Sequence, residues 1–247
     1  MNVIGINVCN GGWLGVKLSN SCWSIRIFKT IDELVDVWKD SDLFFVSIPM
    51  GFLEGSVEER KCDIEARKLL DSSHLDLPAV PCREAIYCNS FGVANIVNKR
   101  LTGRSVSTRL WDVIEKIREL DKFLFNHIEY RDKFKESNCE IGFFVLSGRF
   151  MRNSKTVLAG YKERRDILRK VYPNVDEILD YSIKTFRRKD VRTENVLDAV
   201  CLAINGFIGL KNGFISMPEE PEYDINNIKM QIEIPKSIEY SYGKDVI

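Results

Sequence analysis

The chain has 247 residues, 45% of them hydrophobic, which is enough for one large domain or for a core with an inserted subdomain. Lysine plus arginine and aspartate plus glutamate are equal at 36 each, so net charge favours neither nucleic acid nor a membrane as partner. The first residues do not resemble a signal peptide, and no apolar run approaches the roughly 20 residues that cross a bilayer. Seven scattered cysteines without a C-x-x-C pair, and two histidines, predict reduced thiols in a cytoplasmic protein.

The start of the chain predicts three consecutive antiparallel strands. Residues 2–9 are apolar and β-branched, and Gly11 and Gly12 then favour a tight turn. Residues 13–18 alternate in the manner of a strand with one buried face, and residues 22–28 repeat that pattern after a second turn.

A helix and a returning strand follow. Thr30 and Glu33 have the spacing of a capping box, which predicts a helix that starts there and ends near residue 39. The almost continuous apolar run 42–48 is typical of a strand buried on both faces. A crossover helix makes this strand parallel to the first, so their carboxyl ends meet where open α/β sheets bind ligands. Asn7 and Ser47 stand at those two ends.

The rest of the chain is expected to be mostly helical. The helical patterns fall at residues 57–70, 107–125, 140–146, 160–171, 175–181 and 195–210. A short fifth strand is expected within 133–139, and 217–235 is expected to be a loop with an edge strand at 229–234. We therefore predict one α/β domain over residues 1–247, with a five-stranded mixed sheet flanked by helices and a helical insertion at about 54–130.

Several short motifs together are similar to a known family. They are G-I-N-V-C-N-G-G-W from Gly5, S-I-P-M-G from Ser47, R-K-C-D-I-E-A-R from Arg60, T-G-R-S-V-S from Thr102, K-I-R-E-L-D from Lys116, S-K-T-V-L-A-G from Ser154, V-L-D-A from Val196 and M-P-E-E-P from Met217. In this order they resemble a bacterial and archaeal domain of unknown function, number 429, described as predicted RNase H-like nucleases.

The resemblance implies an RNase H-like core in which acidic residues converge at the carboxyl edge of the sheet. The family pattern has aspartates where this chain has Asn7 and Ser47. A glutamate at the end of the fifth strand is matched by Glu136, with Glu140 four residues on, and an aspartate of the last helix is matched by Asp198. Between the two glutamates, Asn138-Cys139 replaces the family's histidine-proline.

This pattern implies chemistry with Mg²⁺ or Mn²⁺. Two such ions activate water and stabilise the leaving oxygen during phosphodiester hydrolysis, and both prefer carboxylate oxygens. The metal ligands implied are Asn7, Ser47, Glu136, Glu140 and Asp198, and the catalytic residues implied are Glu136, Asp198 and Lys155. An amide and a hydroxyl carry no charge, so the loss of two carboxylates should weaken divalent binding severely.

Basic residues supply candidates for phosphate contacts. Lys155 matches the lysine of the family pattern, and the other candidates for substrate binding are Arg60, Arg104 and Arg164. The densest basic run lies at 184–192 and could track a nucleic-acid backbone, although such a run is more often an exposed face. Arg60 could equally belong to a structural framework.

Three interpretations remain open from the sequence. The first is a metal-dependent, RNase H-like nuclease-type protein that acts on nucleic-acid phosphodiesters and is catalytically impaired at positions 7 and 47. The second is a non-catalytic protein that binds nucleic acid or a nucleotide in the same cleft. The third is an interaction protein that keeps the motifs for packing. The sequence does not indicate an oligomeric state.

Overall fold

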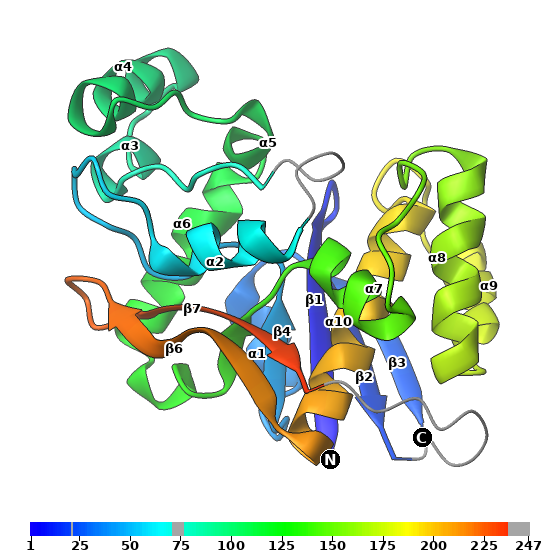
Figure 1. Cartoon of the computed structure of the whole chain (residues 1–247). Helices are drawn as coiled ribbons and strands as arrows, with labels where there is room; N and C mark the ends of the chain where they lie inside the picture. The colour runs from blue at the N-terminus through cyan, green and yellow to red at the C-terminus, as the bar shows by residue number, and fades with distance from the viewer. Residues whose placement is uncertain (21, 71–76, 237–247) are drawn as a thin grey trace. The chain divides into compact units, whose positions relative to one another are not determined.

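The structure is a computed structural model that describes residues 1–20, 22–70 and 77–236 (Figure 1). These residues form an α/β fold around one mixed sheet of seven strands in the order β3-β2-β1-β4-β5-β7-β6. The strands are β1 (Asn2–Cys9), β2 (Gly12–Ser19), β3 (Trp23–Phe28), β4 (Leu43–Val46), β5 (Phe134–Glu136), β6 (Phe214–Tyr223) and β7 (Lys229–Pro235).

The expectation of five strands was wrong, because the segment predicted as a loop contains β6. The two prolines of that strand, Pro218 and Pro221, lack the N–H group that a ladder requires and made the sequence look like a loop. The strand order puts β6 at the border of the sheet, where prolines are tolerated. The strand expected at 229–234 is present as β7, but it lies between β5 and β6 rather than at the edge.

The predicted strand directions are confirmed. β1 pairs antiparallel with β2, and β2 with β3, whereas β4 is parallel to β1 and β5 is parallel to β4. The crossover contains α1 (Ile31–Val37), and Thr30 caps its start as expected, but Glu33 bonds to the residue before the cap, so the predicted capping box is only half formed. Thr30 Oγ1 accepts from the Glu33 N–H at 3.2 Å, and Glu33 Oε2 accepts from the Lys29 N–H at 2.9 Å.

Two glycines let helices pack directly on opposite faces of the sheet. A Cβ atom at Gly5 would collide with the backbone of Ala199 and Ala203 in α10 (Thr193–Asn212). A Cβ atom at Gly15 would collide with the ring of Trp38, which caps α1. Gly5 pairs with Val16, and paired residues share a face of the sheet. Gly15 is next to Val16 in β2, so Gly15 belongs to the opposite face from Gly5. Helix α10 therefore covers one face of β1 and β2, and α1 covers the other.

Helix α10 is the centre of the larger hydrophobic core. It contacts α7 (Cys139–Ser147), α8 (Leu158–Val171) and α9 (Val175–Thr185), which lie together in Figure 1. By length and composition α10 could cross a membrane, but 78% of its most apolar window is buried inside the protein. That burial is typical of the core helix of a soluble domain.

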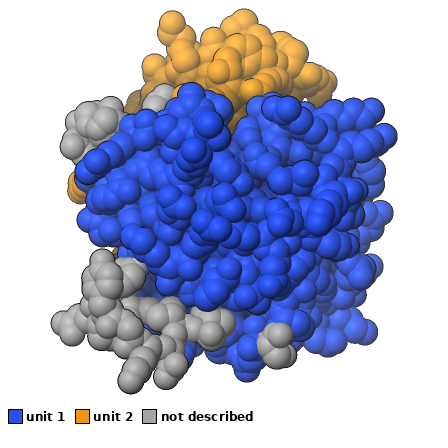
Figure 2. Space-filling view, turned by 90° about the vertical axis from the view of Figure 1, so that its right-hand side faces the viewer, with its two compact units in different colours: residues 1–47, 133–215, 233–247 blue, residues 48–132, 216–232 orange. Residues whose placement is uncertain are grey.

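The chain forms two compact units, coloured separately in Figure 2. Unit 1 comprises residues 1–47, 133–215 and 233–247, and unit 2 comprises residues 48–132 and 216–232. The helical insertion expected at 54–130 falls within unit 2. The helices of unit 2 are α2 (Lys61–Leu69), α3 (Arg83–Ile86), α4 (Phe91–Thr102), α5 (Thr108–Trp111), α6 (Ile114–Asn126) and a 3-10 turn at Ile128–Tyr130.

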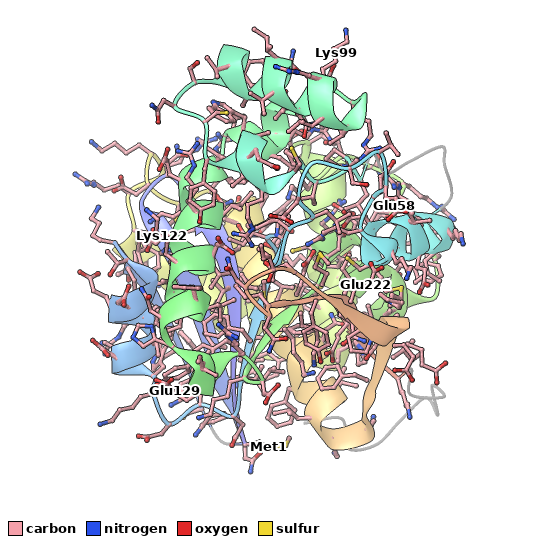
Figure 3. All side chains as sticks on the ribbon, turned by 90° about the vertical axis from the view of Figure 1, so that its left-hand side faces the viewer. Met1, Glu58, Lys99, Lys122, Glu129 and Glu222 are labelled. Atoms are coloured by element: carbon pink, nitrogen blue, oxygen red, sulfur yellow. The ribbon has the colours of Figure 1, made fainter. Side chains whose placement is uncertain are left out.

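The helices of unit 2 differ from expectation: α2 begins at Lys61 rather than at residue 57, and the short α3 was not expected. The single helix expected at 107–125 is broken into α5 and α6, because the Val113 backbone leaves the helical region at φ −113° and ψ 12°. Helix α4 was not expected, since its glycine and asparagines lower helix propensity, but Ser90 caps its start and Gly103 ends it in the left-handed region. Figure 3 shows Lys99 of α4 on the outside of this unit.

Candidate functional site

The candidate site begins where β1 and β4 end side by side. Ser47 directly follows β4, and its N–H donates to the carbonyl of Ile6 in β1 at 3.3 Å. The Asn7 side chain is 8% exposed, and its Nδ2 donates to Ser47 Oγ at 3.2 Å. The two residues that replace the expected aspartates are therefore hydrogen-bonded to each other. They lie on the sheet face that α10 covers, because Asn7 alternates in phase with Gly5.

A third uncharged side chain completes this contact. Asn195, in the first turn of α10, donates through Nδ2 to Asn7 Oδ1 at 3.2 Å and to the Val8 carbonyl at 3.3 Å. Asn195 Oδ1 accepts from the Arg192 N–H at 3.1 Å, so the same side chain also contributes to capping the N-terminus of α10. Asn195 was not predicted as a site residue. It lies one helical turn before Asp198, and this spacing places both side chains on the same face of α10.

The buried acid of the site is Asp198, on the next turn of α10. Its side chain is 1% exposed, and Oδ2 accepts from Lys155 Nζ at 2.5 Å. Its other oxygen, Oδ1, is buried and has no hydrogen-bond partner among the described residues. Burial raises the pKa of Asp198, and the neighbouring Lys155 ammonium opposes this rise. Burial lowers the pKa of Lys155, but the charge of Asp198, its hydrogen bond and other nearby acidic groups together outweigh burial, and the net shift is upward.

Cys139 lies between these groups as a neutral thiol. Its Sγ is 4.0 Å from Asn7 Nδ2 and 3.9 Å from the Asp198 carbonyl oxygen. Burial, and then the charge of Asp198, raises the pKa of Cys139 well above its ordinary value. A thiol in such surroundings is a poor nucleophile and a poor metal ligand, so Cys139 acts here as a small packing residue.

Lys155 is carried by a loop of residues 149–157, called the lysine loop here, which α8 holds in place. A Cβ atom at Gly160 would collide with the Ser154 carbonyl, so only glycine lets the loop approach the first turn of α8 this closely. Glu163 then accepts from Arg149 Nη1 at 2.5 Å and from the N–H groups of Arg152 and Asn153, both at 3.1 Å. Burial acts to raise the pKa of Glu163, but these hydrogen bonds outweigh it and lower that pKa.

The predicted ligand Glu140 is already paired. Both of its carboxylate oxygens accept from Arg164 Nη2, at 2.8 and 2.7 Å. The Arg164 side chain is 3% exposed, donates to the carbonyls of Asn153 and Gly160, and stacks over the Phe143 ring. Arg164, predicted to contact substrate, therefore lies in the interior and joins α7, α8 and the lysine loop.

Glu136 is not brought together with Asp198. It pairs in register with Val46 of β4, and Val46 pairs with Ile6 of β1. These positions alternate with Asn7 and Ser47, so the side chain of Glu136 belongs to the opposite face of the sheet. The Glu136 side chain is 5% exposed. The sequence placed Glu136 at the correct strand end but could not define the register.

The two other arginines predicted to contact substrate lie in unit 2. Arg60 is 2% exposed, binds Asp63 through Nε at 3.0 Å and Nη2 at 2.7 Å, and donates to the carbonyls of Met50 and Gly51. Arg104 donates to the carbonyls of Val57 and Glu58, both at 2.7 Å. These contacts match the framework alternative raised for Arg60, since both arginines organise the chain around residues 50–63.

The acids of the site do not fit a two-metal centre. Within residues 1–20, 22–70 and 77–236, no three His, Cys, Asp or Glu side chains gather closely enough to hold a metal ion. The charge of Asp198 is balanced by Lys155, and that of Glu140 by Arg164. The site therefore carries no excess negative charge to replace the hydration shell of a divalent cation.

Comparison with known proteins gives one result. A family model described as "Protein of unknown function (DUF429)" matches residues 5–222 of the chain. Neither the curated proteins nor the solved structures gave a match. The matched range includes Asn7, Ser47, Lys155, Asn195 and Asp198.

Proposed function

We propose that the chain, which belongs to this family of proteins of unknown function, is an RNase H-like protein of the nuclease type whose metal-dependent cleavage is impaired. Its remaining activity is to bind nucleic-acid phosphodiesters at the carboxyl ends of β1 and β4.

The order and direction of the strands support the fold part of the proposal. Three antiparallel strands lead through a crossover helix to β4, which is parallel to β1, and β5 continues in the same direction. This is the order that an RNase H-like core requires, and it creates a switch point beside β1 where ligands bind in open α/β sheets. Asn7, Ser47 and Asp198 lie at that point.

The single observation that carries the loss of cleavage is the uncharged pair Asn7–Ser47, joined at 3.2 Å. Where aspartates would converge, an amide donates to a hydroxyl, and Asn195 completes the set. Mg²⁺ and Mn²⁺ need carboxylate ligands to offset the cost of their dehydration. A site with two neutral groups and one ion-paired acid binds either ion weakly.

The same geometry supports binding of phosphate. The Lys155 side chain is 40% exposed although its ammonium pairs with Asp198, so this cation stands at the surface of the site, where an anion approaches. Basic side chains of the segment before α10, among them Arg188 and Arg192, are exposed in the same unit. Cations that neutralise backbone phosphates bind without sequence preference and with strong salt dependence.

A metal-dependent nuclease is the second candidate, and one observation favours it. The Oδ1 atom of Asp198 is buried and has no hydrogen-bond partner among the described residues, so one carboxylate oxygen of the site is not committed to another protein group. On that hypothesis, cleavage would require a divalent cation and would be lost in Asp198→Ala.

Binding can be measured by fluorescence anisotropy with labelled single-stranded, duplex and hybrid oligonucleotides, in EDTA and at several salt concentrations. The proposal predicts binding that persists in EDTA, weakens as salt rises, and falls at least about tenfold in Lys155→Ala. Lys162→Ala, which removes an exposed lysine of α8, is the matched control and should bind normally. Binding that is equal in both variants would contradict the proposed role of Lys155.

A further inference from the structure

Unit 1 contains a cavity of about 710 Å³ next to the proposed site. It lies among the lysine loop, the start of α8, the last turn of α9 and the start of α10, which are neighbours in Figure 1. Its volume falls in the range of sites that hold small organic ligands, roughly 300–1,000 Å³. It contains Lys155, Arg188 and Arg192, the cations of the proposed function, but the proposed function assigns no role to its apolar and aromatic lining.

The cavity has a positively charged lining. Three cations contribute to it, Lys155, Arg188 and Arg192, against one carboxylate, Glu194. Lys155 pairs with Asp198, and Arg192 lies 3.5 Å from Glu194, but Arg188 has no ion pair among the described residues. An unpaired guanidinium at a cavity can bind a phosphate through two parallel hydrogen bonds.

Two helices also begin at this cavity. Leu158 is the first residue of α8 and Thr193 the first of α10, and both residues line it. No side chain forms a capping hydrogen bond at the start of α8. The first N–H groups of a helix and its positive dipole end favour an anion. The helix ends therefore reinforce the charge of Arg188.

Most of the remaining lining is apolar or aromatic. Tyr161 and Phe186 contribute rings that are half-buried, and Ile183 and Val191 contribute aliphatic surface. Aromatic side chains stack on nucleobases with little preference among them. A ligand that satisfies both parts of the lining must combine an anionic phosphate with a planar ring.

We propose that this cavity binds a nucleoside monophosphate unit, with its phosphate at Arg188 and the helix starts and its base against Tyr161 and Phe186. The unit is either a free mononucleotide or the phosphorylated end of a single strand. The inference goes beyond the proposed function, because it assigns this cavity a small ligand that Arg188 and the two aromatic side chains recognise, and it does not depend on Asn7 and Ser47.

Isothermal titration calorimetry of the full chain tests the proposal with AMP, UMP, adenosine and inorganic phosphate. We expect AMP and UMP to bind alike, and adenosine and phosphate to bind at least about tenfold more weakly, since each lacks half of the recognised chemistry. Failure of both nucleotides to bind at millimolar concentration, or equal affinity for AMP and adenosine, would overturn the proposal.

Two neighbouring arginines provide a matched pair of variants. Arg188→Ala should weaken AMP binding at least about tenfold. Arg187→Ala removes the adjacent guanidinium, which pairs with Asp190 at 2.7 Å and does not line the cavity, and should bind AMP normally. Both side chains are exposed, so neither change should prevent folding. Equal effects of the two variants would refute a specific site.

Short oligonucleotides distinguish the two sources of the ligand, a free mononucleotide and the phosphorylated end of a single strand. A pentathymidylate with a 5′-phosphate that binds at least as tightly as UMP, and loses affinity in Arg188→Ala, identifies the end of a strand as the ligand. A pentathymidylate that binds far more weakly than UMP identifies the free nucleotide. Either result supports the proposed cavity, and neither requires binding at Asn7 and Ser47.

Discussion

The substitution Lys155→Ala should lower the free energy of unfolding, because Lys155 supplies the counter-charge of the buried Asp198 carboxylate. The Asp198 side chain is 1% exposed, and Lys155 Nζ is the hydrogen-bond donor to its Oδ2. In Lys155→Ala the carboxylate would stay buried without a counter-charge, while Oδ1 already lacks a partner. The carboxylate would then either remain ionised at a large cost or take up a proton.

The expected loss follows from the burial of the two partners. Breaking a fully buried ion pair by removing one partner costs about 3–5 kcal/mol. Lys155 is 40% exposed, so water screens part of the interaction, and we expect a smaller loss of about 2–3 kcal/mol in the free energy of unfolding. Asp198→Asn should cost less, because an amide needs no counter-charge and the lysine can turn to water.

The loss should depend on pH. Burial raises the pKa of Asp198, and loss of the opposing lysine raises it further. An acid whose folded-state pKa is raised stabilises the fold below its unfolded pKa of about 3.9, and this contribution disappears as pH rises through the folded pKa. The penalty of Lys155→Ala should therefore be small near pH 4 and grow toward pH 8.

Urea unfolding at pH 4.5 and pH 8 measures both effects. Lys155→Ala is compared with the double variant Lys155→Ala/Asp198→Asn, which should recover most of the loss at pH 8. Lys162→Ala is the surface control and should change stability by less than about 0.5 kcal/mol. A loss in Lys155→Ala that matches the control at both pH values would refute the account of Asp198 as a buried, ionised group.

Three further predictions concern the surroundings of the site. Glu163→Gln should weaken the hydrogen bonds that hold the lysine loop and speed hydrogen exchange of the loop amides. Because the pKa of Glu163 is lowered, the wild-type loop should keep these bonds until the pH falls below the ordinary glutamate pKa of about 4.3. Gly5→Ala should cost about 3 kcal/mol or more in urea unfolding, since its Cβ would meet the backbone of α10, whereas Gly92→Ala, where no atom lies within 4 Å, should be neutral or slightly stabilising. Alkylation at pH 8 followed by mass spectrometry should label the exposed Cys22 and spare Cys139, whose pKa is raised by burial; equal labelling of both would contradict the buried thiol.

The sequence predicted the parts of the fold that local patterns determine. Alternation and the turn at Gly11 and Gly12 defined β1 and β2, and the Thr30–Glu33 spacing defined the start of α1. It failed where tertiary contacts override local preference. β6 contains prolines that are acceptable because of its place in the sheet, and α4 contains residues of low helix propensity.

The site was predicted in position but not in detail. Asn7 and Ser47 come together as the strand order implies, because β1 and β4 end side by side, and Asp198 lies on the helix that covers the same face. Strand register placed Glu136 on the other face, and that register cannot be derived from a three-residue strand. The ion pair of Glu140 with Arg164 joins residues 24 positions apart on different helices, so no local sequence pattern predicts it.

The most direct test of the account is cleavage of single-stranded, duplex and hybrid substrates with Mg²⁺ or Mn²⁺ by three forms of the protein. These are the native chain, the double variant Asn7→Asp/Ser47→Asp, and the same double variant with Asp198→Ala. We expect the native chain to be inactive or nearly so, and the restored variant to cleave in a manner that depends on Asp198. Efficient cleavage by the native chain would contradict the claim that the Asn7–Ser47 pair impairs the site.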